Sequence, residues 1–466
     1  MERLSGLDAS FLYLETSSAL LNVCGLILLE RSEHDFDSVH SALERCVAAV
    51  PDFRKKLQDS ILNLDHPAWI EDPEFDVERH IHRVVVPAPG GPRELADLCG
   101  LIAGGRLDRS HPLWEMWLIE GLADGSNALM AKMHHATVDG VTGANMMTQM
   151  FSLSPDAPPP GTSSGVGPGN RLALVAGSWL SVLGRPVKLA RVIPETAGML
   201  AGWLGRAVRG EAMPPPFVAP RTGFNRNITG HRNIAFAQLD LAAVIEVKTA
   251  FGLKINDVVL AICAGALRRY LENRHELPES PLICVVPMSV HERSDRPGTN
   301  QVSAMSASLA TDITDPVERL HVIAKNYERG KAHGKAISPT ILHDWAQLGS
   351  QSLLGVGARA YSGLHLAEHH PVVHNLVISN VAGPPAPLYF LGARIIGMFP
   401  FGPIMHGAGL NITVISGDGR LDIGLIGCPE LIPELWSLAE AMSPSLDELL
   451  GAARTIHPEP PSEARV

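Results

Sequence analysis

The sequence predicts an α/β protein built as two lobes. Apolar runs of strand length alternate with segments of helical period in residues 1–155, and the same alternation returns in residues 233–466. Between them, residues 156–232 differ sharply in composition. Of the 466 residues, 45% are hydrophobic and 19% charged, which suits a folded chain with more than one core. We therefore expect two lobes joined by a crossover segment.

In the first lobe the elements follow one another closely. Short apolar runs predict strands, and apolar residues spaced three or four apart predict amphipathic helices. The strands are expected at residues 22–29, 82–86, 112–119 and 127–134, and the helices at 37–50, 93–106 and 141–153.

The middle segment begins with a Pro/Gly/Ser-rich linker over residues 156–170. Residues 171–232 then hold nine Lys/Arg against only Glu195 and Glu211, a local charge of about +7 in a chain of net charge −11. Trp179, Trp203 and several aliphatic residues alternate with these cations. This pattern is typical of a helix that docks on a membrane surface, and equally of a helical hairpin packed on the protein with its basic face in water.

The second lobe repeats the alternation. Asn256 is a candidate helix cap, Ser443 and Pro444 fit the cap and first position of the last helix, and Gly417-Asp418-Gly419 predicts a hairpin turn. The strands are expected at residues 235–241, 282–290, 302–310, 374–381, 410–415 and 421–426. The helices are expected at residues 256–271, 316–329, 339–348, 435–442 and 444–453.

Composition excludes several classes of function. The negative net charge argues against nucleic acid as a partner. The N-terminus does not resemble a signal peptide, and no apolar run reaches the ~18 residues of a membrane-spanning helix. The cysteines show no paired spacing and are expected to be buried, reduced thiols of a cytosolic protein: Cys24, Cys46, Cys99, Cys263, Cys284 and Cys428.

The densest group of reactive side chains lies at residues 133–140, at the end of a predicted strand. Side chains alternate along a strand, so His135 and His134 should point to opposite faces and only one can face a substrate. Asp139 is placed to cap the following helix or to bind a distant arginine, and Gly140 leaves open space beside the imidazole. A neutral histidine suits a general base that takes a proton from a hydroxyl or a thiol. A purely structural histidine pair with a capping aspartate fits the same residues.

The pattern His134-His135-x-x-x-Asp139-Gly140 resembles the HHxxxDG signature of acyl-CoA-dependent acyltransferases of the chloramphenicol acetyltransferase type. With the other motifs in order, the chain is similar to the bacterial wax ester synthase/diacylglycerol acyltransferase family, especially its actinobacterial triacylglycerol synthases. The further motifs occupy residues 4–15, 112–114, 256–261, 287–290 and 379–384. Two details depart from the family: His291 and Glu292 precede Arg293 where relatives carry a basic residue at once, and Ala382 replaces a common proline.

The resemblance implies a two-lobed chloramphenicol acetyltransferase-like fold of mixed sheets and helices, with an active-site channel between the lobes. It implies that His135 is the general base, that His134 and Asp139 support the geometry, and that Gly140 borders the substrate. Asn256 and Asp257 would be structural, at the lobe interface. The base would activate the hydroxyl of diacylglycerol or a fatty alcohol for direct attack on a long-chain acyl-CoA, without an acyl-enzyme.

By the same resemblance no cofactor or metal is expected, acyl-CoA being a substrate. The expected location is cytoplasmic, peripheral on the inner membrane face or on lipid inclusions. The alternative is a module of the same fold that uses carrier-protein thioesters, or one that binds lipid without catalysis.

Two rival signals are weak. Residues 161–165 match G-x-S-x-G but lie in the linker, without the strand and helix that a nucleophile elbow requires. The second signal is a group of histidines with i, i+4 spacing that could bind a metal on a helix, although Pro371 and the lack of further ligands favour a solvated or structural role. Its members are His365, His369, His370 and His374.

Overall fold

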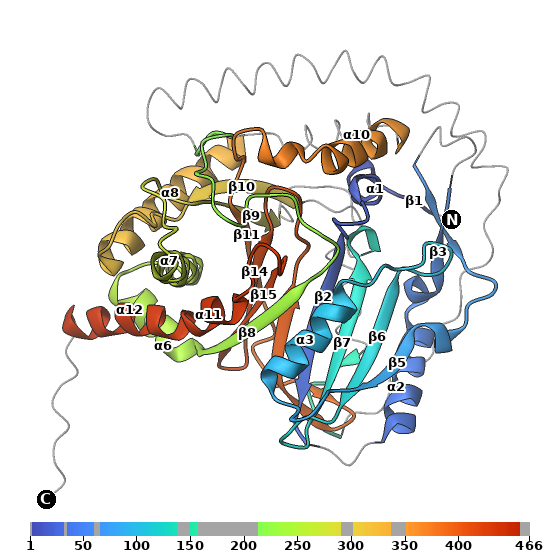
Figure 1. The fold of residues 1–466 in the computed structure, drawn as a ribbon. Coiled ribbons are helices and arrows are strands. Elements are labelled where there is room, and N and C mark those ends of the chain that lie inside the picture. The colour runs from blue at the N-terminus through green and yellow to red at the C-terminus, as the bar shows by residue number, and fades with distance from the viewer. Residues whose placement is uncertain are drawn as a thin grey trace, which may run out of the picture.

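Two six-stranded sheets form the body of the protein in the computed structural model, and helices pack on both (Figure 1). The α/β, two-lobed expectation is confirmed. The structure describes residues 2–31, 35–59, 66–137, 150–156, 213–289, 302–336 and 351–456.

The first sheet has the strand order β12-β13-β2-β7-β6-β5, with β5 parallel to β6 and the other neighbours antiparallel. Helices α2 and α3 cover its two faces, because α2 packs with Leu129 of β7 whereas α3 packs with the alternate residues Ala128 and Met130. The elements are β2 (Asn22–Leu29), α2 (Phe36–Ala49), β5 (Ile81–Val85), α3 (Pro92–Ala103), β6 (Trp114–Glu120) and β7 (Asn127–His134).

The second sheet has the order β10-β9-β11-β14-β15-β8, with β11 parallel to both of its neighbours. Its core helix is α7, in which every residue from Asp257 to Leu267 is buried. The strands are β8 (Asn233–Asp240), β9 (Ile283–Ser289), β10 (Val302–Ser308), β11 (Leu376–Ala382), β14 (Leu410–Gly417) and β15 (Arg420–Gly427). The helices are α6 (Leu241–Ala250), α7 (Ile255–Asn273), α8 (Pro316–Ala336), α11 (Leu435–Glu440) and α12 (Met442–Ile456).

The chain that follows β11 links the two lobes. After β11 the chain forms β12 (Tyr389–Phe390) and β13 (Ala393–Phe401), and β13 pairs with β2 of the first sheet. Thus residues that follow position 233 complete the sheet of the first lobe. The sequence did not predict β13 as a strand, since Gly397 and Pro400 interrupt its apolar pattern.

Helices α1 (Gly6–Leu14) and α10 (Gln351–Gly363) pack against each other at the top of the molecule, near the end of β7 (Figure 1). Ser5 caps α1 by accepting the backbone N–H of Asp8. A small sheet beside them has the order β1 (Glu2–Arg3), β4 (Ala68–Glu71), β3 (Lys55–Gln58). Neither α1 nor α10 was predicted from the sequence, nor was α6.

Most predicted elements agree with the structure, and three local expectations are wrong. Lys254 precedes α7 as its cap, so Asn256 lies inside the helix. Helix α12 begins at Met442, so Ser443 and Pro444 are interior to its first turn. The helix expected to run to residue 153 does not include residues 151–153. The helix expected at 339–348 lies outside the described residues.

The hairpin and the cysteines agree with expectation. Asp418 and Gly419 both have positive φ, 47° and 75°, in the two-residue turn between β14 and β15. All six cysteines are buried and none is bridged. In the described ranges, no helix is by itself long and apolar enough to cross a membrane; α6 and α7 pass that test only as a pair, bent by 106°.

Candidate active site

The two histidines lie where β7 ends, in the middle of the first sheet. His134 pairs with Asn22 of β2, and the His135 N–H donates to the Leu21 carbonyl at 2.8 Å. A short 3-10 turn, His135–Thr137, then redirects the chain, and the Thr137 hydroxyl donates to the His134 carbonyl at 2.6 Å. The backbone on either side is thus fixed by the sheet and the turn.

His134 is fully buried and tied to the end of α1. Its Nδ1 accepts the Ala136 N–H at 3.1 Å, so the proton of the neutral ring is on Nε2, which lies 3.3 Å from Glu15 Oε2. Arg109 pairs with the same carboxylate oxygen at 2.5 Å. Burial acts to raise the pKa of Glu15, but the contacts with His134 and Arg109 outweigh it and hold that pKa below its ordinary value. The contact between His134 and Glu15 thus joins the end of β7 to the end of α1.

His135 has a different environment. Its half-buried ring stacks on Phe11 of α1, with ring centroids 4.1 Å apart and planes 23° apart. Burial, with a smaller electrostatic contribution from the neighbouring His134 imidazole, holds the pKa of His135 below its ordinary value of 6.5. The imidazole is consequently neutral at pH 7 and has a lone pair available as a base. Phe11 lies in the N-terminal motif, whose contact with His135 the sequence did not reveal.

Asp139 and Gly140 lie outside the described residues, as does Arg293. Of the predicted catalytic and substrate-binding residues, the structure therefore places only His134 and His135, and it gives their rings separate partners.

A cavity of about 460 Å³ lies near the histidines, although neither of them lines it. It is lined by Leu21, whose carbonyl binds His135, and by Leu14 and Thr16, which flank Glu15. Its walls are mostly apolar, and its size lies in the range of small-molecule pockets. Ala19, between α1 and β2, also lines the cavity. The other lining residues come from α10 and from the segments before β11 and after β13: Leu354, Gly357, Ala358, Tyr361, Ala367, His370, Val372, Val373, His374, Met405, His406, Gly407 and Ala408.

Asn225, a fully buried side chain, holds the cavity loops together. Its Nδ2 donates to the carbonyls of Asn375 at 2.9 Å and Gly407 at 2.7 Å, while its Oδ1 accepts the Thr222 hydroxyl at 2.6 Å and Asn375 Nδ2 at 2.8 Å. Arg221 extends this network by donating to the His370 carbonyl at 2.5 Å. The sequence placed both residues in the basic crossover segment and gave no sign of this role.

The histidines at 365–374 do not lie on an α-helix, because α10 ends at Gly363 and only a short 3-10 turn, Leu366–Glu368, follows it. His365 and His369 are exposed, as expected, whereas His370 and His374 are half-buried and line the cavity. No group of three or more metal-ligating side chains occurs in the part of the chain that the structure describes.

Asn256 and Asp257 make contacts within the second lobe. Asp257 Oδ2 accepts the Lys254 N–H at 3.0 Å at the start of α7, and Asn380 Nδ2 of β11 donates to Asn256 Oδ1 at 3.3 Å. These contacts fasten α7 to β11 and are compatible with a structural role.

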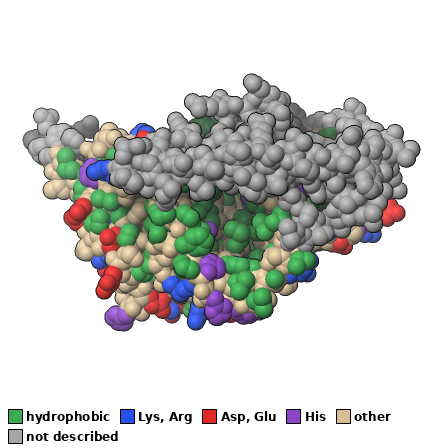
Figure 2. Space-filling view, turned by 90° about the horizontal axis from the view of Figure 1, so that it is seen from above, with side chains coloured by type: hydrophobic (Ala, Val, Ile, Leu, Met, Phe, Trp, Pro, Cys, Tyr) green, Lys and Arg blue, Asp and Glu red, His purple; other side chains and the backbone are tan. Residues whose placement is uncertain are grey.

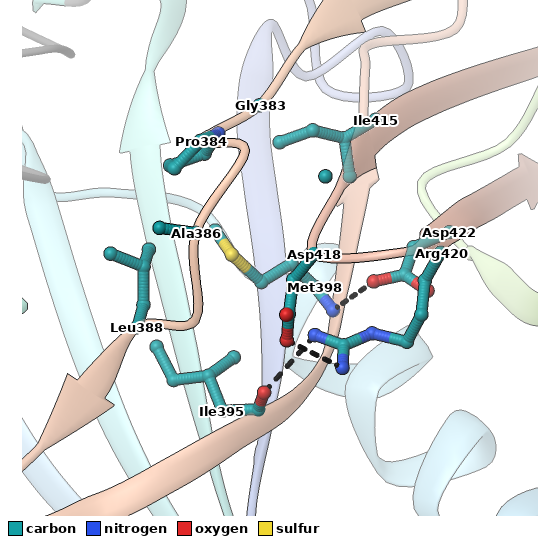
Figure 3. Close-up of a pocket in the computed structure, with 11 residues that line it drawn as sticks. Gly383, Pro384, Ala386, Leu388, Ile395, Met398, Ile415, Asp418, Arg420 and Asp422 are labelled. Carbon is teal, nitrogen blue, oxygen red and sulfur yellow. Dashed lines mark hydrogen bonds and ion pairs between the residues drawn. The ribbon is translucent and has the colours of Figure 1, made fainter. Parts of the chain in front are cut away.

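A second, much smaller cavity of about 20 Å³ marks the junction of the lobes (Figure 3). There Arg394 of β13 and Arg420 of β15 both pair with Asp418 at 3.0 Å. Asp422 of β15 accepts the Met398 N–H at 2.8 Å. The space is too small for a lipid. These contacts fasten β13, a strand of the first sheet, to the second sheet.

A two-lobed fold with a histidine pair at the end of a central strand, beside an apolar cavity, defines an acyltransferase of the HHxxxDG class. Family models for the wax ester synthase/diacylglycerol acyltransferase catalytic domain and for the C-terminal domain match residues 4–259 and 298–450. The chain belongs to this family.

Sequence relatives and solved structures support the same family assignment. The chain is 50% identical over 455 residues to a Mycobacterium tuberculosis protein named as a candidate diacylglycerol O-acyltransferase, covering 97% of this chain and 90% of that one. It is similar to the wax ester synthase/diacylglycerol acyltransferase of Marinobacter aquaeolei, with a TM-score of 0.71, 31% identity and coverage of 97% and 100%. A condensation domain of the calcium-dependent antibiotic synthetase shares the fold, with a TM-score of 0.55, 15% identity and coverage of 97% and 96%.

Proposed function

We propose that this enzyme transfers a long-chain acyl group from acyl-CoA to the free hydroxyl of diacylglycerol, giving triacylglycerol. One observation carries the proposal: in a chain of this family, a neutral histidine with a lowered pKa is hydrogen-bonded through its backbone to Leu21, which lines a large apolar cavity. An apolar cavity favours alkyl chains because their transfer out of water is favourable.

In the proposed reaction His135 removes the proton of the acceptor hydroxyl as its oxygen attacks the thioester carbonyl. A C–O bond forms, the tetrahedral intermediate collapses, the C–S bond breaks, and the CoA thiolate takes the proton back from His135. Direct transfer agrees with the state of the cysteines. Burial raises the pKa of all six, to about 12 for Cys24 and Cys263, so none is an activated nucleophile.

A fatty alcohol presents the same hydroxyl, so wax ester synthesis is a second activity of the proposed site. Two alternatives use the same fold: acyl transfer from a carrier-bound thioester, and lipid binding without catalysis. The intact histidine pair supports catalysis over simple binding.

Purified protein incubated with labelled palmitoyl-CoA and diacylglycerol, hexadecanol or glycerol tests the proposal. We expect labelled triacylglycerol, a smaller yield of wax ester, and little thiol release without an acceptor. Thiol release that does not depend on an acceptor would instead identify a hydrolase. Transfer from a carrier thioester but not from CoA would favour the carrier alternative.

We further propose that the enzyme docks on a lipid surface through the cavity mouth. Leu14, Val373 and Met405 line the cavity yet are 38–41% exposed, and on or next to α10 Val356 and Leu364 are 57% and 65% exposed. Figure 2 views this side of the molecule and shows hydrophobic side chains gathered there, with histidines among them. Diacylglycerol resides in membranes, so a mouth that touches the lipid shortens its path. The basic segment around Trp179 and Trp203, which lies outside the described residues, remains a second predicted contact.

The double variant Val356→Asp/Leu364→Asp should reduce co-sedimentation with vesicles of phosphatidylcholine and phosphatidylglycerol at least threefold, because two charges replace apolar surface that would enter the lipid. Leu101→Asp, which changes a leucine on α3 that is 76% exposed, serves as the control and should bind like the unaltered protein. Equal binding by all three proteins would contradict docking through α10.

A further inference from the structure

The wall of the cavity near His135 is mostly apolar, but four aromatic polar side chains from three segments line it. They are Tyr361 of α10, His370 and His374 before β11, and His406 after β13, and the Tyr361 ring contacts those of His370 and His406. The catalytic step proposed above uses none of them.

The hydrogen bonds of Tyr361 and His370 are satisfied between themselves and the backbone. His370 Nδ1 lies 2.6 Å from the Pro371 carbonyl oxygen, which can only accept, so Nδ1 carries the proton. His370 Nε2 is then an acceptor, and the Tyr361 hydroxyl donates to it at 2.6 Å. This pair therefore has no donor left for a ligand.

His406, in contrast to this pair, has a ring nitrogen without a hydrogen-bond partner among the described residues. The backbone N–H of Ile228 donates to its Nδ1 at 3.3 Å, so the proton of the neutral ring is on Nε2. Burial, the nearby Arg232 and His365 lower the pKa of His406 to about 4, so the ring is neutral at pH 7. Nε2 is buried and has no hydrogen-bond partner among the described residues.

The backbone around His406 is held in place. The Gly407 N–H donates to the Arg226 carbonyl at 2.9 Å, and Asn225 Nδ2 donates to the Gly407 carbonyl at 2.7 Å. The His406 ring meets the Tyr361 ring edge-on, with centroids 6.3 Å apart. A fixed, shielded N–H without an acceptor is unfavourable, and a ligand that supplies an oxygen removes the penalty.

We propose that His406 Nε2–H donates a hydrogen bond to an ester carbonyl oxygen of a glyceride acceptor, and thereby selects diacylglycerol over fatty alcohols. The inference rests on the proposed function. A fatty alcohol has a single oxygen, which must lie at His135 for reaction, so its alkyl chain would leave the His406 donor unpaired. A site built to pair with a ligand group discriminates strongly against a ligand that lacks it.

The test compares kcat/KM for a diacylglycerol and for hexadecanol, with palmitoyl-CoA as donor, in the unaltered protein, His406→Phe and His406→Gln. Phenylalanine keeps the aromatic contact with Tyr361 and removes the donor, whereas the glutamine amide can still donate. We expect His406→Phe to lower the ratio of kcat/KM for diacylglycerol to that for hexadecanol about tenfold, which corresponds to the loss of one hydrogen bond. His406→Gln should keep most of the ratio.

An unchanged ratio in a folded His406→Phe protein would overturn the inference while the proposed function stood. An equal loss with both acceptors would also overturn it, because that is the signature of a structural role. If His406→Phe does not fold, His406→Leu carries the same expectation. Absence of transfer to either acceptor by the unaltered protein would overturn the proposed function itself and this inference with it.

Discussion

Replacing His135 with alanine should lower the rate of acyl transfer by about 10²–10⁴-fold, the range that a positioned general base contributes. The fold should survive, because the ring is only half-buried and the variant loses the stack on Phe11. The measurement is the initial rate of triacylglycerol formation, with thermal unfolding as the check on folding. Unimpaired transfer by folded His135→Ala would remove His135 from the mechanism.

The pH dependence of the acyl-transfer rate is a second test of His135 as the base. A base must be unprotonated, and the pKa of His135 is held below 6.5 mainly by burial. The rate of the unaltered enzyme should therefore be near its maximum at pH 8, and its acid limb should have a midpoint below pH 6.5. Phe11→Ala, which removes the stacked ring and admits water, should move this acid limb toward higher pH. A limb that stays in place would show that Phe11 does not shield the base.

Much of the secondary structure could be predicted because each strand carries a strong local pattern. Strands β2 and β7 were placed to the residue, since both are short, mostly apolar runs bounded by polar or turn residues. Strand alternation predicted separate environments for His134 and His135, although β7 ends at His134 and a 3-10 turn places His135. The choice between a structural pair and a catalytic base did not follow, because it depends on partners brought by tertiary contacts.

Those partners lie far away in the sequence. Glu15 and Phe11 reach the histidines from α1, more than a hundred residues earlier, and no local pattern near them indicates that contact. The cavity is assembled from the start of the chain, α10 and the loops around His374 and His406. His370 and His374 were noticed for metal-ligand spacing, which assumed a helix that the chain does not form. Strand β13 was missed because Gly397 and Pro400 interrupt its apolar pattern.

The second large effect expected is at Asn225. Replacement by alanine should lower the free energy of unfolding by about 3–5 kcal/mol, since it leaves several buried polar groups without partners at once. The carbonyls of Asn375 and Gly407 lose their donor, and the Thr222 hydroxyl loses its acceptor. Chemical denaturation followed by tryptophan fluorescence measures the loss, and acyl transfer should fall with it because the loops that carry His374 and His406 are no longer fixed.

Two variants show whether the hydrogen bonds, and not the lost volume, cause this effect. Asn225→Asp preserves the shape but has no N–H to donate to the two carbonyls, so it should destabilise the protein about as much as alanine does. Asn227→Ala, two residues away, removes a single half-exposed bond to the Ser362 carbonyl at 2.8 Å and should cost about 1 kcal/mol. If Asn225→Asp were as stable as the unaltered protein, the donor bonds would not be what holds the loops. Asn225 would then act by packing alone. The position of His406 would in that case be held by the two remaining contacts, the hydrogen bond of the Gly407 N–H to the Arg226 carbonyl and that of the Ile228 N–H to the His406 ring.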